Sequence, residues 1–236
     1  MSEIRAVAVE RLDLRFAPRP WPFADQRRAD IEAHFAALKR KRPALWNGPV
    51  MLLHEWGLHD GAFQGAYLQT DFASMIAWRD WDFPDDSVRN CFAQAALQSA
   101  DGAFLLGVMS QHTANAGKIY FPSGTPDPHD IHGTIVDLDG GMMRELTEET
   151  GLDARDVEPD SRWHAVFAGP RIAMMKVLRC AEPAANVRAR ILAYLARQAA
   201  PELADVRIVR GPPDIDPQMP SFISVFLHDR WGMGLQ

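Results

Sequence analysis

Apolar and polar residues follow regular periods along most of the chain, and these periods predict a mixture of strands and helices. Asp60 and Gly61 form a pair typical of two-residue hairpin turns, and Asp71 is placed to cap a helix. In the first third of the chain the pattern predicts a strand at residues 4–15, a helix at 24–41, a hairpin of strands at 50–56 and 62–69, a short helix through Trp78 and a linker at 80–87.

Strands become more frequent after residue 88, which predicts an α/β domain. We expect two parts: an N-terminal strand and helix extension or subdomain over residues 1–86, and an α/β domain with C-terminal helices over residues 87–236. The elements expected in the second part are strands at 90–98, 103–110, 118–121, 163–167, 172–178 and 206–210, and helices at 138–150, 186–198 and 221–230.

The composition narrows the classes of protein. The chain has 236 residues, of which 47% are hydrophobic and 24% charged, and a net charge of −6 without a basic block argues against nucleic acid as a partner. The apolar run Ala103–Met109 is too short to cross a membrane, so we expect no membrane partner. Cys91 and Cys180 are expected to be buried free thiols, and together with an N-terminus that lacks a signal-peptide core they favour a cytoplasmic protein.

Three carboxylates gather on one face of the predicted helix that precedes Gly151. Glu145, Glu148 and Glu149 are spaced i, i+3 and i+4, so they fall within an arc of about 100°. Asp137 is a plausible N-cap, and Gly151 is expected to end the helix in the left-handed region. Like charges at this spacing destabilise a helix, and a bound Mg²⁺ would offset their repulsion. The competing interpretation is an ordinary solvated acidic face.

The sequence of this helix resembles a known motif. Arg144 to Leu152 read R-E-L-T-E-E-T-G-L, and every specified position is similar to the second half of the Nudix (MutT-like) hydrolase motif, R-E-U-x-E-E-x-G-U, with U aliphatic. The first half departs from the family pattern. With Gly124 at the start of the motif, Asp130 stands where the family has its first Glu, and thirteen residues separate Asp130 from Arg144 where the family has seven. We interpret the difference as an insertion at residues 131–136; the alternative is that the first acid is lost.

The resemblance implies a fold and an activity. The fold would be an α/β/α sandwich around a mixed sheet, and the activity would be hydrolysis of the diphosphate linkage in a nucleoside diphosphate derivative, with Mg²⁺ or Mn²⁺ as cofactor. It implies that Glu148 and Glu149 are metal ligands, followed by Glu145 and by Asp130. Arg144 would orient a carboxylate through an internal salt bridge, and Glu149 or a residue of another loop would be the catalytic base. Many members of the family are dimers, so a homodimer is the assembly to test.

The substrate is suggested by two further segments. Leu45–Pro49, L-W-N-G-P, and Ser123–Pro128, together with the inserted motif, are similar to the Nudix branch that cleaves UDP-sugars to UMP and a sugar 1-phosphate. The alternatives are ADP-ribose, NADH or coenzyme A as substrate, or a Nudix-like module that binds a ligand without hydrolysing it. The residues proposed to contact substrate are Arg79, Trp46, Asn47 and Gly124. For Trp46, and for Trp56, Trp78 and Trp81, we favour a place in the core over stacking on a base.

Overall fold

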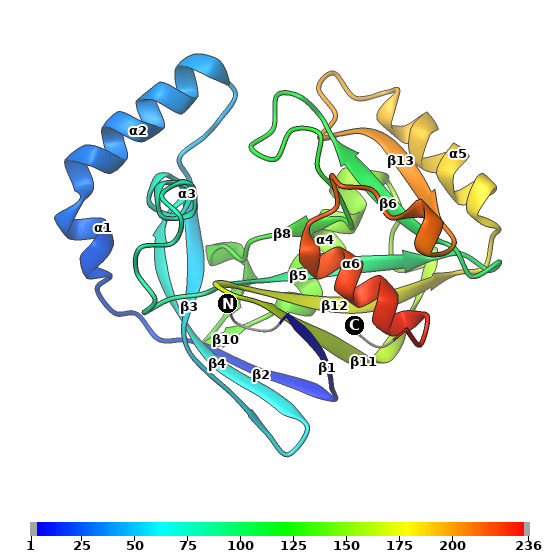
Figure 1. Ribbon diagram of the computed structural model, residues 1–236, viewed down its shortest axis with the longest axis horizontal. Coiled ribbons are helices and arrows are strands. Elements are labelled where there is room, and N and C mark those ends of the chain that lie inside the picture. The colour runs from blue at the N-terminus through cyan, green and yellow to red at the C-terminus, as the bar shows by residue number, and fades with distance from the viewer. Residues whose placement is uncertain (1–3, 234–236) are drawn as a thin grey trace.

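The computed structural model describes residues 4–233, and residues 1–3 and 234–236, at the outer ends of the two expected parts, lie outside the described residues. Two β-sheets and the helices around them form the fold (Figure 1). The larger sheet contains, in spatial order, β1 (Arg5–Val9), β11 (Val157–Ala168), β12 (Arg171–Cys180), β5 (Asn90–Gln98), β6 (Phe104–Met109) and β13 (Leu203–Val209), with the short strands β7 (Ile119–Tyr120) and β8 (Ser123–Gly124) beside β6 and β5.

The smaller sheet is built from the N-terminal part of the chain and from the stretch before residue 137. Its order is β3 (Pro49–His59), β4 (Ala62–Asp71), β2 (Arg11–Phe16), β10 (Ile135–Val136) and β9 (Ile131–His132). The helices are α1 (Pro22–Gln26), α2 (Arg28–Lys41), α3 (Phe72–Asp80), α4 (Leu138–Thr150), α5 (Ala184–Leu195) and α6 (Ser221–Arg230), and short 3₁₀ turns lie at Pro128–Asp130 and Pro212–Asp214.

Alternate residues of β11 and β12 contact helices on opposite faces of the larger sheet. Lys176 places its Nζ 4.8 Å from the centroid of the Trp163 ring and 4.0 Å from Asp139, at the start of α4. His164, the residue after Trp163, instead lies 5.7 Å from the Phe226 ring of α6. Because β12 pairs in parallel with β5 and antiparallel with β11, the sheet is mixed. Helices α4 and α6 cover opposite faces of a mixed sheet (Figure 1), so the expected α/β/α arrangement is confirmed.

The single strand expected at residues 4–15 is wrong. The chain bends at Glu10, and β1 pairs with β11 of the larger sheet whereas β2 pairs with β4 of the smaller one. Val9 and Leu14 are both buried, so the apolar pattern continues through the bend and hides the change of partner. The helix expected at 24–41 is likewise divided, because the chain leaves helical geometry at Arg27 between α1 and α2.

The inserted stretch forms a small hairpin that joins the two parts of the chain. β9 and β10 pair with each other, and Ile135 of β10 pairs with Arg15 of β2. The amide of Phe16 also donates to the Thr134 carbonyl at 2.8 Å. The insertion therefore anchors the loop before α4 to the smaller sheet.

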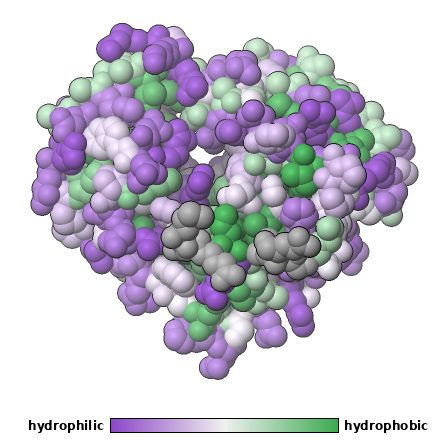
Figure 2. All heavy atoms as spheres, in the orientation of Figure 1, coloured by the Kyte–Doolittle hydropathy of each residue, from purple (hydrophilic) through white to green (hydrophobic). Residues whose placement is uncertain are grey.

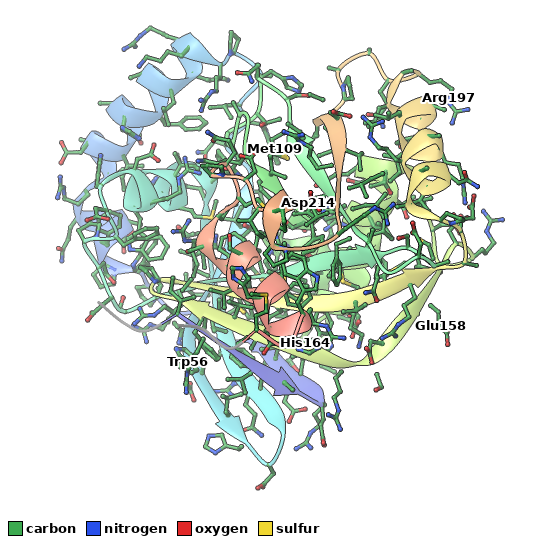
Figure 3. All side chains as sticks on the ribbon, turned by 45° about the vertical axis from the view of Figure 1, so that its right-hand side comes forward. Trp56, Met109, Glu158, His164, Arg197 and Asp214 are labelled. Atoms are coloured by element: carbon green, nitrogen blue, oxygen red, sulfur yellow. The ribbon has the colours of Figure 1, made fainter. Side chains whose placement is uncertain are left out.

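The tryptophans of the N-terminal part differ in their surroundings. Trp78 is fully buried, as expected of a core residue, and its indole N–H donates to the Asp85 carbonyl. Trp56, labelled in Figure 3, lies where the β3–β4 hairpin meets the larger sheet, with its ring 5.2 Å from that of Phe167. Trp46 is 73% exposed, so the expectation that it belongs to a core is wrong.

Two further features bear on the expectations drawn from composition, namely the state of the cysteines and the apolar character of the helices. Cys91 and Cys180 are both buried and free, as expected. Among residues 4–233, no helix combines the length and the apolar character that a membrane crossing requires.

Candidate active site

Helix α4 begins and ends where the sequence predicts. The Asp137 side chain accepts a hydrogen bond from the Gly140 amide at 3.0 Å, and Gly151 ends the helix with φ +73°. Tyr194 packs against Gly151 so closely that an added Cβ would lie 2.5 Å from its ring. Leu146 is fully buried, so the helix turns its apolar face to the core and holds the acidic face beside it.

The larger sheet is split next to this helix. Strands β5 and β6 pair at Gln98 and Phe104 and then separate. Beyond that point β7 pairs with β6, and β8 pairs with β5 through Gln94 and Ser123. The loop that carries β8 lies against α4, and its backbone meets the acidic face of the helix at the split.

Glu149 is the most deeply buried of the three carboxylates, with 4% of the residue exposed. Its Oε1 accepts a weak hydrogen bond from the Ser123 amide at 3.4 Å, and its Oε2 is buried without a hydrogen-bond partner. Burial raises the pKa of Glu149 well above its ordinary value, and the charges of Glu145 and Glu202 raise it further. A buried acceptor without a partner is costly, so this position fits a cation.

Glu145 lies one turn before Glu149 and faces the same loop. Its Oε1 accepts from Arg144 Nη1 at 2.9 Å, and burial raises its pKa to about 7. The carboxylate sits directly against Gly124, where an added Cβ would lie 2.4 Å from Oε1. A side chain at position 124 would therefore require the Glu145 carboxylate to move. Gly124, which the sequence proposes as a substrate contact, lies directly against Glu145.

Asp130 and Arg144 are brought together across the inserted hairpin. Arg144 Nη2 donates to Asp130 Oδ1 at 3.0 Å, and Asp130 Oδ2 accepts from the Asp127 amide at 3.0 Å. Asp130 is 6% exposed. The ion pair ties the 3₁₀ turn at Pro128–Asp130 to helix α4. It also places Arg144 in the internal salt bridges expected of it.

Glu202 is an acidic residue of this region that the sequence did not reveal. It immediately precedes β13, it is exposed, and its charge raises the pKa of both Glu145 and Glu149. No motif surrounds it, and it joins the others only because β13 pairs with β6 through Leu203 and Met109. Glu148, the remaining predicted ligand, is exposed on α4.

The carboxylates do not form a closed metal cage by themselves. Within residues 4–233, no group of three or more His, Cys, Asp or Glu side chains stands close enough to hold a metal ion. Glu145 is turned toward Arg144, and Glu148 is exposed to solvent. The donor atoms are nevertheless carboxylate oxygens, which suit Mg²⁺ or Mn²⁺, and the unpartnered Glu149 Oε2 points to one such ligand position.

A large cleft opens beside the carboxylates. Its volume is about 910 Å³, which is within the range of small-molecule sites, and it reaches Ser123 and Glu202. Figure 2 shows the surface hollowed between the helices of the N-terminal part and the part that carries α5 and α6. Met109, labelled in Figure 3, lines the cleft from the end of β6. The lining thus comes from both parts of the chain.

Basic side chains line the cleft although the chain is acidic overall. They are Arg42, Arg79, Lys118 and Arg171. Arg79 is held by a polar chain, because its Nη1 donates to Asn115 Oδ1 at 3.0 Å and Asn115 Nδ2 contacts the Tyr120 hydroxyl at 3.0 Å. A positive cleft next to a carboxylate cluster suits a polyanionic substrate that binds together with a metal ion.

The other residues predicted to contact substrate lie near the same cleft. Trp46 lines it and exposes its ring at the protein surface. Asn47 uses its amide oxygen to accept from the Ala73 amide at 2.7 Å, so it helps to fix the start of α3. The backbone amide of Met51 also donates to the Pro126 carbonyl at 2.8 Å, which ties the segment after residue 49 to the loop before α4.

Comparison with known proteins gives similarity to solved structures only. No family model and no curated protein match the sequence. The Nudix hydrolase RenU from M. smegmatis superimposes with a TM-score of 0.38 and 16% identity over 62% of this chain and 87% of that chain. The MutT protein from Methanosarcina mazei Go1 gives 0.40 and 19% over 62% and 96%. The pyrophosphohydrolase BsRppH from Bacillus subtilis gives 0.38 and 11% over 80% and 98%. These identities and TM-scores are too low to assign a family or an activity.

Proposed function

We propose that this chain is a Nudix hydrolase that cleaves the diphosphate linkage of a nucleoside diphosphate derivative in a reaction that requires Mg²⁺ or Mn²⁺. The observation that carries the proposal is Glu149, a buried carboxylate with one unpartnered oxygen, located beside Glu145 at the edge of a basic cleft. A bound cation would neutralise phosphate charge and activate water.

The side chains divide the work as follows. Glu149, Glu145 and Glu148 would hold the cation, and Arg144 fixes Glu145 through their 2.9 Å contact. Asp130 contributes by holding Arg144. The water oxygen forms a bond to one phosphorus, the bond from that phosphorus to the bridging oxygen breaks, and the bridging oxygen leaves with the other phosphate. One proton of the water passes to a carboxylate. Glu202 is exposed at the cleft and is suited to accept that proton, with Glu149 as the alternative.

Other side chains of the cleft would contact the parts of the substrate that lie away from the metal ion. Arg79 is held in place by Asn115 and would pair with the diphosphate, as proposed from the sequence. Trp46 presents an exposed ring at the cleft, where it would stack on a base or a sugar.

Our leading substrate is a nucleotide sugar such as UDP-glucose, cleaved to UMP and a sugar 1-phosphate. It is supported by the meeting of the two segments that resemble the UDP-sugar branch, since Leu45, Trp46, Ser123 and Thr125 line one cleft. ADP-ribose, NADH and coenzyme A remain the alternatives.

A second candidate is a ligand-binding module without hydrolytic activity. It is favoured by one observation, that no group of three acidic or His side chains within residues 4–233 is preformed for a metal. The two functions differ in whether Glu149 is needed for turnover.

The test is Glu149→Gln, which keeps the shape of the side chain and removes its charge. We expect the rate of hydrolysis to fall by about two orders of magnitude or more, while the melting temperature does not decrease. Glu158→Gln, an exposed residue of β11 labelled in Figure 3, is the matched control and should keep wild-type turnover. Wild-type turnover in Glu149→Gln would refute the metal site.

A further inference from the structure

Arg171 is a half-buried cation of the cleft that the proposed mechanism does not use. It is the first residue of β12, and its guanidinium carbon lies 5.7 Å from the ring centroid of Phe83 and 5.8 Å from that of Phe222. Its Nε is buried without a hydrogen-bond partner. The two rings hold the guanidinium in place and leave its donors free.

Within the described part of the chain, no carboxylate compensates the Arg171 charge. Among residues 4–233, no acidic side chain lies within ion-pair distance of Arg171, whereas Arg79 lies close enough to repel it. Burial and the Arg79 charge both lower the pKa of Arg171. Arg79 is itself paired with Asp80 at 2.9 Å, so the charge at Arg171 is the unbalanced one. A partly desolvated guanidinium in this position is favourable when it meets an anion.

Two amide side chains on the floor of the cleft also lack partners. Gln94 is fully buried, yet neither its Nε2 nor its Oε1 is hydrogen-bonded, and the buried Oδ1 of Asn90 is unpartnered as well. Both residues line the cleft from β5, with Phe92 between them on the same face. A buried polar atom without a hydrogen bond destabilises the protein, and a bound polar ligand would supply the missing hydrogen bonds.

Strand β5 sets the order of these groups. Gln94 pairs with Ser123, whose amide contacts Glu149, and Asn90 pairs with Arg171. A rise of about 3.3 Å per residue separates the two backbone positions by about 13 Å. Arg171 therefore lies beside Asn90 at one end of this row, and the contact between Ser123 and Glu149 lies beside Gln94 at the other end.

We propose that Arg171 binds a second anionic group of the substrate, a phosphate or carboxylate carried on the sugar next to the diphosphate. Asn90 and Gln94 contact the hydroxyl groups of that sugar. This inference rests on the proposed function and narrows it, because it selects nucleoside diphosphate derivatives that carry an additional negative charge over neutral ones.

The test compares pairs of compounds that differ in one anionic group: UDP-glucuronate with UDP-glucose, NADPH with NADH, and coenzyme A with 3′-dephospho-coenzyme A. The first pair tests a carboxylate and the other two test a phosphate. Dissociation constants are measured by calorimetry with Glu202→Gln in the presence of Mg²⁺, and kcat/KM is measured with the wild type. We expect at least one pair to favour its anionic member by about 10- to 100-fold in both measurements.

Three variants separate the charge from the fold. Arg171→Met keeps the apolar stem between Phe83 and Phe222, and it should remove the preference for the anionic member of each pair. Arg171→Lys should retain part of the preference. Arg179→Met removes an exposed arginine from the other end of β12 and should change nothing.

The outcomes distinguish this inference from the proposed function. Hydrolysis without a preference for the anionic member of any pair overturns the role of Arg171 and leaves the hydrolase intact. A binding preference that depends on Arg171, without hydrolysis of any compound, sustains the anion site and overturns the hydrolase. A preference that survives in Arg171→Met also overturns the inference.

Discussion

Asp130 and Arg144 form an ion pair, 3.0 Å between Oδ1 and Nη2, although they are fourteen positions apart and separated by an inserted hairpin. The same guanidinium donates from Nη1 to Glu145 at 2.9 Å. Asp130 is therefore connected to the carboxylate cluster through Arg144, and a change at Asp130 should reach Glu145 without any contact between the two acids.

Asp130→Ala is expected to destabilise the protein and to weaken metal binding indirectly. It removes a buried acceptor from Arg144 and from the Asp127 amide, which should cost about 2 kcal/mol of unfolding free energy. Denaturant unfolding and calorimetric titration with Mn²⁺ measure the two effects. Asp130→Asn keeps an acceptor for Arg144 and should lose less stability. An Asp130→Ala variant with wild-type stability would contradict the role given to this ion pair.

Gly124→Ala tests whether the close approach of Glu145 matters. The added methyl would lie 2.4 Å from Glu145 Oε1, so the carboxylate must move. A misplacement of this kind should lower kcat/KM by about tenfold to a hundredfold. Gly211→Ala is the control, because the nearest atom to its added Cβ is 3.7 Å away. Equal activity in the two variants would show that the position of Glu145 is not critical.

Glu202→Gln tests the proton acceptor. Because Glu202 is exposed at the cleft and outside α4, its loss should lower kcat by about a hundredfold or more and leave metal affinity little changed. Glu149→Gln should lower both kcat and metal affinity. Steady-state kinetics and Mn²⁺ titration of the two variants separate these roles. Wild-type kcat in Glu202→Gln would assign the proton to Glu149 instead.

His164 should make stability depend on pH. Burial lowers the pKa of His164 from 6.5, and the Arg230 guanidinium, 3.4 Å from its Nε2, adds to the effect. Above pH 6.5 the ring is neutral in both states and does not contribute. Below pH 6.5 the unfolded chain binds a proton that the folded chain does not, so the unfolding free energy falls as pH falls.

The measurement is denaturant unfolding at pH 7.5 and pH 5. His164→Gln should lose less stability than the wild type between these values, whereas a variant of the exposed His59 should behave as the wild type does. An identical loss in His164→Gln and in the wild type would show that His164 does not carry this dependence.

Helix α4 could be predicted to the residue because its signals are local. Asp137 caps it, Gly151 ends it and Leu146 marks its buried face, and each of these acts within a few positions. The break at Glu10 could not be predicted, since both strands share one alternating pattern and only their pairing partners differ. Pairing across the sheet is a property of tertiary structure, which a periodicity does not contain.

The residues of the candidate site likewise fall into those that local sequence predicts and those that only strand pairing brings in. Glu145, Glu148 and Glu149 belong to one helix, so their spacing is enough to place them on one face. Glu202 and Arg171 have no motif around them and enter the region only through strand pairing and the split of the larger sheet. Trp46 was expected in a core because aromatic residues usually lie there, yet it is exposed at the cleft.

The central claim is tested most directly by product release from UDP-glucose, ADP-ribose, NADH and coenzyme A, each with Mg²⁺, Mn²⁺ or a chelator. The account predicts that at least one compound is cleaved at its diphosphate linkage with either metal ion, that the chelator stops the reaction, and that Glu149→Gln abolishes most of it. Cleavage of the UDP-sugar would support the leading substrate. The contradicting result is that no compound is cleaved with either metal ion although one of the compounds still raises the melting temperature. That result would establish a binding module in place of a hydrolase.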